Sequence, residues 1–132
     1  MNRRDWLRGL LTLTGLGLVP GARAARSELR IQDSPVAGFQ YYDGDLVWDR
    51  LRVGDGLTLR READNRYDHR AVAVWWRDHQ LGYLPRIENH AVAQMLDRGL
   101  PLTARIDALA TSADPWQRLR LSIHFSQRMA WG

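Results

Sequence analysis

The ten residues from Asn65 to Val74 (NRYDHRAVAV) constrain the fold of this chain more than any other stretch. Asn65 and Asp68 favour an ordered turn, because their short side chains bond to nearby backbone groups and tolerate left-handed conformations. The residues that follow are small or β-branched, which favours a strand buried on both faces. Polar groups on a loop at the end of a buried strand are a common design for a binding site. The alternative is that Asn65 and Asp68 only shape a turn, with Tyr67 lying over the edge of the core.

Strand patterns flank this stretch on both sides. The predicted strands, bounded by turn residues and most of them alternating between apolar and polar residues, cover residues 36–42, 57–62, 71–76, 80–83, 102–108 and 119–125. In the second of these strands, Leu57 and Leu59 are expected to face inward. A short apolar run covers residues 46–51, and of Trp75 and Trp76 one is expected to face the core and the other the surface.

One helix is expected after Pro85. Its apolar stripe at helical spacing would consist of Ile87, Ala91, Val92, Met95 and Leu96. Gly99 is well placed to end this helix in a left-handed conformation. About six short strands with one helix predict a mainly β fold, a small closed or nearly closed barrel.

Residues 1–24 have the features of an export signal. A basic start is followed by an apolar run from Leu10 to Val19, and Ala22-Arg23-Ala24 fits a small-residue cleavage site. The run is too short to span a hydrocarbon core of about 30 Å. The paired arginines Arg3 and Arg4 resemble a twin-arginine signal, which predicts a periplasmic protein cleaved after Ala24. The alternative is an amphipathic N-terminal helix of a cytoplasmic protein.

The remaining chain is expected to contain one domain. Residues 25–34 are expected to be a polar lead, residues 35–126 the folded domain and residues 127–132 a tail. After cleavage no stable membrane span is expected, and a monomer is expected.

Charge and composition narrow the possible functions. The formal charge is +4, and all 19 basic residues are arginine. Removal of the signal would leave 15 arginines against 14 acidic residues, so any nucleic-acid surface has to be a local one. The absence of cysteine excludes disulfides, thiolate zinc sites and cysteine nucleophiles. The four histidines lack metal-ligand spacing, and no phosphate-binding glycine loop or nucleophile motif is present. We therefore predict a binding module with no catalytic residues, no metal and no cofactor.

Four segments taken together resemble the HIRAN domain family. They are residues 39–42 (FQYY), 57–62 (LTLRRE), 64–74 (DNRYDHRAVAV) and 81–86 (LGYLPR), in the usual order and spacing of the family. The resemblance covers about residues 35–126 and implies a modified OB-fold barrel.

The resemblance also implies that the domain captures the 3′ end of single-stranded DNA. Tyr41 and Tyr67 would stack on the terminal base and its neighbour, a contact that tolerates any sequence. Asp68 would accept a hydrogen bond from the free 3′-hydroxyl, and Asn65 would brace the loop. A carboxylate repels phosphate and accepts from a hydroxyl, so Asp68 would distinguish an end from an internal nucleotide.

Other positions of the family pattern are matched less uniformly. Arg86 matches a basic position that contacts phosphate, and Phe125 falls near an aromatic beside the terminal bases. Gln40 stands where DNA-binding members carry an arginine, and Tyr83 stands where the best-known ones carry a histidine. Each of these two changes removes a potential phosphate contact, which lowers affinity and its salt dependence. Four arginines could compensate if they lie on the same side: Arg60, Arg61, Arg66 and Arg70.

A second function stays open beside single-stranded DNA. An exported adaptor could use the same face of the barrel for a peptide, a glycan or a protein partner. An electropositive groove from Tyr41 and Tyr67 to Arg86 would favour DNA. An apolar patch with scattered arginines would favour the adaptor.

Overall fold

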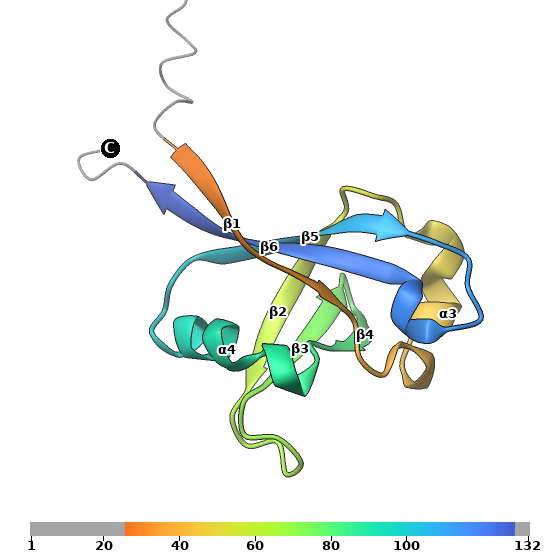
Figure 1. The fold of residues 1–132 in the computed structure, drawn as a ribbon, viewed down its shortest axis with the longest axis horizontal. Helices are drawn as coiled ribbons and strands as arrows, with labels where there is room; N and C mark the ends of the chain where they lie inside the picture. The colour runs from red at the N-terminus through yellow and green to blue at the C-terminus, as the bar shows by residue number, and fades with distance from the viewer. Residues whose placement is uncertain (1–25, 129–132) are drawn as a thin grey trace, which may run out of the picture. The chain divides into compact units, whose positions relative to one another are not determined.

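The computed structural model describes residues 26–128 of the chain (Figure 1). The expected export signal, residues 1–24, lies outside the described residues, as do residues 129–132 of the expected tail. Within residues 26–128, no helix is both long and apolar enough to cross a membrane.

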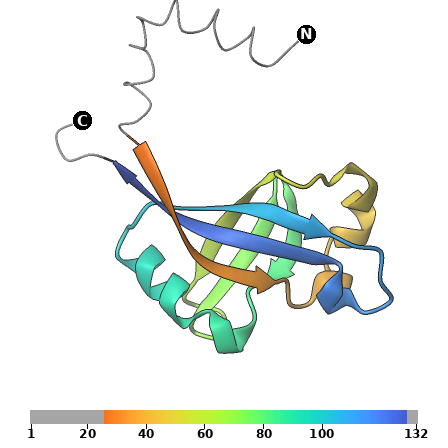
Figure 2. The same cartoon turned by 45° about the horizontal axis from the view of Figure 1, so that its top comes forward.

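The described chain is mainly β, as expected. Its six strands are β1 (Arg26–Pro35), β2 (Gly56–Glu62), β3 (Ala71–Trp76), β4 (His79–Tyr83), β5 (Leu102–Leu109) and β6 (Leu119–Arg128). They form one sheet in the order β1-β6-β5-β2-β3-β4. The pairs β2–β3, β3–β4, β2–β5 and β5–β6 are antiparallel. Both views show β5 and β6 crossing over β2, β3 and β4, so the sheet folds back on itself (Figures 1 and 2).

Two α-helices and four short 3₁₀ turns connect the strands. They are η2 (Phe39–Tyr41), α3 (Gly44–Val47), η3 (Trp48–Arg50), η4 (Arg86–Glu88), α4 (His90–Asp97) and η5 (Pro115–Gln117). In Figure 1, α4 and α3 lie at opposite ends of the strand layers. The expected helix is thus confirmed as α4, with α3 as an addition.

A two-bond seam joins the two margins of the sheet and almost closes it into a barrel. The Ala37 amide donates to the Tyr83 carbonyl at 2.7 Å, and the Tyr83 amide donates to the Ala37 carbonyl at 3.0 Å. Ala37 follows β1, and Tyr83 ends β4, the last strand of the sheet. The sheet is roughly barrel-like, although no continuous strand pairing closes it. This agrees with the expected OB-like architecture.

The core lies between the two strand layers, and β3 runs through it as expected. Val72 and Val74 are fully buried, and Trp76 is buried while Trp75 is half-buried. On β2, Leu57 is buried and Leu59 packs against the core, which confirms their expected inward direction.

The prediction of a first strand at residues 36–42 was wrong. Gly38 adopts a left-handed conformation with φ of 76°, which turns the chain, and the η2 turn follows. The strand lies earlier, in the segment expected to be a polar lead, where β1 covers Arg26–Pro35. The apolar run at residues 46–51 belongs to α3 and η3.

Helix α4 is shorter than its apolar stripe suggested. Ile87 lies in η4 and is 92% exposed, and Ala91 is exposed as well, so the expected places of these two residues in the buried stripe were wrong. Val92 and Ala93 are the buried residues of the helix. Its expected end is confirmed: Gly99 has φ of 73°, and the Leu100 amide donates to the Met95 carbonyl at 3.1 Å, closing a Schellman motif.

Candidate nucleic-acid interface

The loop between β2 and β3 is ordered by its own side chains. The Asn65 Oδ1 atom accepts hydrogen bonds from the backbone amides of Tyr67 at 2.9 Å and Asp68 at 3.1 Å. The Asp68 Oδ1 atom accepts from the Arg70 amide at 2.9 Å. These contacts confirm that Asn65 and Asp68 shape the turn, and they leave the Tyr67 ring projecting outward with 79% exposed.

A buried asparagine fixes the Asp68 carboxylate. The Asn89 side chain is 1% exposed, and its Nδ2 atom donates to Asp68 Oδ2 at 2.8 Å. Asn89 directly precedes α4, yet its side chain makes no capping hydrogen bond to that helix. Both Asp68 oxygens therefore have a donor, which holds the carboxylate as an oriented acceptor.

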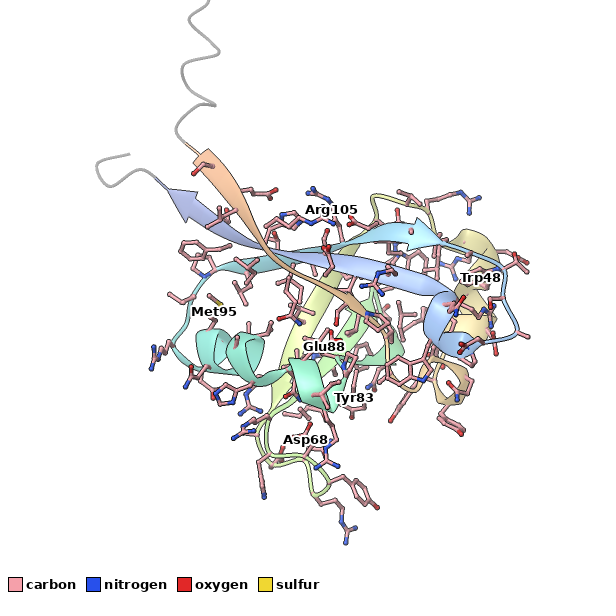
Figure 3. The ribbon with its side chains drawn as sticks, viewed as in Figure 1. Trp48, Asp68, Tyr83, Glu88, Met95 and Arg105 are labelled. Atoms are coloured by element: carbon pink, nitrogen blue, oxygen red, sulfur yellow. The ribbon has the colours of Figure 1, made fainter. Side chains whose placement is uncertain are left out.

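A second carboxylate, Glu62, ties this loop to β4. Its Oε1 atom accepts from Tyr83 Oη at 2.8 Å and from Asn65 Nδ2 at 3.1 Å. The Tyr42 ring packs edge-on against the Tyr83 ring with centroids 5.7 Å apart. Figure 3 shows Tyr83 and Asp68 on the same side of the molecule. The loop and β4 are thus joined through a single acceptor.

Burial, followed by the hydrogen bond to Glu62, raises the pKa of Tyr83 to about 12. A phenol whose folded-state pKa exceeds its unfolded value of about 10 stabilises the fold fully below pH 10. That contribution is lost as the pH rises from about 10 to 12, since the unfolded chain releases the proton first.

We expect the free energy of unfolding to fall by about 1–2 kcal/mol between pH 9.5 and 11.5 because of Tyr83 alone. Urea titrations at stepped pH would measure this fall, which Tyr83→Phe should remove. Tyr41→Phe, at an exposed ring, serves as the control and should leave the slope unchanged. Equal slopes in wild type and Tyr83→Phe would contradict the assignment.

Between the loop and η2 lies a pocket of about 540 Å³. Its lining comes from both margins of the seam: Ala37, Gly38, Tyr41, Tyr42, Asn65, Arg66, Tyr67, Asp68, Ala71, Tyr83, Leu84 and Arg86. Tyr41 of η2 and Tyr67 of the β2–β3 loop are 78% and 79% exposed. The pocket thus combines two exposed phenol rings, one oriented carboxylate and two arginines, Arg66 and Arg86.

Six of the eight residues that the sequence nominated line this pocket: Tyr41, Asn65, Tyr67, Asp68, Tyr83 and Arg86. The other two are not part of its lining. Gln40 is exposed in η2 beside Tyr41, and Phe125 pairs with Leu102 where β6 meets β5.

Two residues that hold the site were not nominated. Glu62 and Asn89 each lie 21 residues from their partners Tyr83 and Asp68. The only sequence signal at Asn89 is its place before a helix, which favours a cap rather than a contact with the loop.

Of the four arginines that could compensate for Gln40 and Tyr83, one lines the pocket and three do not. Arg66 lines the pocket, and Arg70 is exposed in the loop. Arg60 lies over the Trp75 ring, with its Cζ atom 4.1 Å from the centroid. Arg61 forms an ion pair with Asp97 of α4 at 2.9 Å, so it is not available to the pocket.

The sequence model of the HIRAN domain family matches residues 29–129 of the chain. The chain belongs to the HIRAN domain family. The matched residues include most of β1.

Two solved structures are similar to this HIRAN domain. One is a protein from Lactobacillus plantarum, 32% identical, with a TM-score of 0.65 over 78% of this chain and 99% of the other. The other is the HIRAN domain of human HLTF, 20% identical, with a TM-score of 0.59 over 76% of this chain and 80% of the other. The second shows the shared fold. No curated protein matches the chain.

Family membership assigns the kind of function. HIRAN domains are known for DNA binding, which supports a nucleic-acid-binding module, and the domain itself is a binding domain rather than a catalytic one. Within residues 26–128, no three histidine or acidic side chains gather in a group that could hold a metal ion.

Proposed function

We propose that this HIRAN domain captures the free 3′ end of single-stranded DNA in the pocket between η2 and the β2–β3 loop. The observation that carries the proposal is the Asp68 carboxylate, held by the Asn89 side chain and the Arg70 amide in a pocket flanked by two exposed tyrosine rings.

Tyr41 and Tyr67 supply the stacking surfaces. Every base has a π-face, and stacking on an aromatic side chain contributes about 1–3 kcal/mol per base whatever the sequence. Because the two rings come from η2 and from the β2–β3 loop, which line one pocket, two successive bases at a strand end can each have a ring. Binding by these rings is therefore independent of base identity.

Asp68 supplies the preference for a free end. Each of its oxygens has spare acceptor capacity beyond the donors already in place, and a terminal hydroxyl can fill it. An internal nucleotide offers a phosphodiester at that position, which the carboxylate repels. Arg66 and Arg86 line the same pocket and can bind the last phosphates, a role that the uncharged side chains of Gln40 and Tyr83 do not fill.

Asp68→Ala is expected to weaken binding of an oligonucleotide with a 3′-hydroxyl by about 1.5–3 kcal/mol, the range for a hydrogen bond to a charged group. The same variant should bind a 3′-phosphorylated oligonucleotide no more weakly, because a repulsion is removed. Fluorescence anisotropy with both oligonucleotides, labelled at the 5′ end, would measure this.

The matched control is Asp64→Ala, which removes an exposed carboxylate from the same loop. It should change the affinities for the two oligonucleotides by the same small amount. An equal loss for both ligands in Asp68→Ala would show that Asp68 does not recognise the hydroxyl. No binding of either ligand to the wild-type chain at moderate salt would refute the proposed function.

A further inference from the structure

One face of β2 and β3 continues from the pocket past Tyr83, a pocket residue that pairs with Ala73 of β3. Ala71 lines the pocket, and alternate residues of a strand share a face, so Ala73 and Trp75 follow it on that face. The two alanines are buried beneath their neighbours, and Trp75 is half-buried. Their partners on β2 are Glu62, Arg60 and Thr58 in the same order. From Ala71 to Trp75 the face extends about 13 Å, at about 3.3 Å per residue.

This face changes character along its length. Near the pocket it carries the Glu62 carboxylate, which the Tyr83 phenol and the Asn65 amide already occupy. Farther along it carries an arginine and an indole. The exposed Arg60 side chain lies over the half-buried Trp75 ring, 4.1 Å from its centroid. A positive charge on an aromatic platform therefore lies beyond the pocket.

Arg60 and the next residue, Arg61, differ in their contacts. Arg61 points to the opposite face, where Asp97 pairs with it at 2.9 Å and the Ala71 carbonyl accepts from it at 3.2 Å. Within residues 26–128, no carboxylate forms an ion pair with Arg60. The ring orients the guanidinium without using its N–H donors, so these donors are free for an anionic partner.

We propose that a strand with its 3′ end in the pocket leaves across this face, and that Arg60, supported by Trp75, binds the phosphodiester backbone upstream of the terminal two nucleotides. This inference rests on the proposed function. The positive charge matches a phosphate chain, the face begins at the pocket residue Ala71, and OB folds commonly bind about 4–16 nucleotides. The two stacking tyrosines would bind only two of these nucleotides.

The first test compares ligand lengths. Arg60→Gln, which keeps much of the side-chain stem, should weaken binding of a 3′-hydroxyl octanucleotide by about three- to tenfold and lower the salt slope by about 0.7. It should leave the affinity for a dinucleotide unchanged. NMR titration of the full chain can measure both ligands, since it detects weak binding. Arg120→Gln, at an exposed arginine on β6, is the matched control and should affect neither.

The second test locates the strand directly. Octanucleotides carrying a single photoreactive thymine at each position from the 3′ end would be crosslinked to the wild-type chain and mapped by mass spectrometry. Positions one and two should label peptides that contain Tyr41 or Tyr67. Positions three to five should label the peptide that contains Trp75.

The outcomes separate the two proposals. If the octanucleotide does not bind the wild-type chain, the proposed function itself fails. If it binds and Arg60→Gln binds it as tightly as wild type does, the path across β2 and β3 is wrong while end capture stands. Labelling of β5 or β6 peptides by positions three to five would overturn the path as well. An equal loss for the dinucleotide and the octanucleotide would place Arg60 in the pocket instead.

Discussion

Gly82→Ala is expected to lower the free energy of unfolding by about 3 kcal/mol, the combined scale of backbone strain and overpacking. A Cβ atom at Gly82 would lie 2.3 Å from the Ala37 carbonyl oxygen and 2.6 Å from Val36 Cγ1. The backbone of Gly82 also has φ of 149°, a conformation that side chains disfavour. The first of these contacts is to backbone, so the seam has to separate before the methyl group fits.

Urea denaturation followed by tryptophan fluorescence would measure this loss. The control is Gly56→Ala, at the start of β2, where a Cβ atom would meet no heavy atom within 4 Å. That control should change stability by less than about 1 kcal/mol. If both variants are equally stable, the close approach of β4 to the segment after β1 is not as described.

The double variant Tyr41→Ala/Tyr67→Ala should bind single-stranded DNA about 2–6 kcal/mol more weakly, since each ring is expected to stack on one base. Both rings are largely exposed, so the thermal melting temperature should hardly change. Fluorescence anisotropy with a 3′-hydroxyl oligonucleotide and with a 3′-phosphorylated oligonucleotide would measure the loss.

The matched control for the two rings is Tyr41→Phe/Tyr67→Phe, which retains the π-faces and removes only the hydroxyls. It should bind within about 1 kcal/mol of wild type. Because stacking does not sense the terminal group, the alanine variant should lose affinity for both ligands, in contrast to Asp68→Ala. A double alanine variant with wild-type affinity would exclude these rings as the base platform.

Elements with one apolar face could be predicted from the sequence. Strands β2, β5 and β6 bury apolar side chains with the period of a strand, and α4 ends at a glycine in the conformation that its position required. The small and β-branched run of β3 predicted its burial on both faces. Strand β1 could not be found this way, because its outward side chains form charged pairs with β5. Arg30 pairs with Asp107, and Glu28 with Arg105.

In the segment after β1, the sequence predicted a strand that the structure does not contain. Val36 and Phe39 are buried, and their apolar pattern suggested a strand. The left-handed backbone at Gly38 overrides that pattern, because one residue of positive φ redirects the chain whatever its neighbours prefer. A glycine within an apolar run was the one sequence signal of this turn.

In the candidate site, contacts between residues close in sequence could be predicted, and contacts between distant residues could not. The loop contacts of Asn65 and Asp68 join residues within three positions, so turn chemistry alone predicted them. The contacts of Glu62 with Tyr83 and of Asn89 with Asp68 depend on how β4 and the start of α4 pack beside the loop. Residue type and spacing carry no information about such packing.

A ligand in the proposed pocket would stabilise the seam between Ala37 and Tyr83. Two backbone hydrogen bonds join Ala37 to Tyr83 and one more joins Asp43 to Gln80, whereas the β2–β3 pair is in register over five residue pairs. The pocket takes Tyr41 and Tyr42 from one margin and Leu84 and Arg86 from the other. A ligand that fills it touches both, so separating the margins would cost the binding energy as well. Such a ligand would therefore make this short closure of the sheet harder to open.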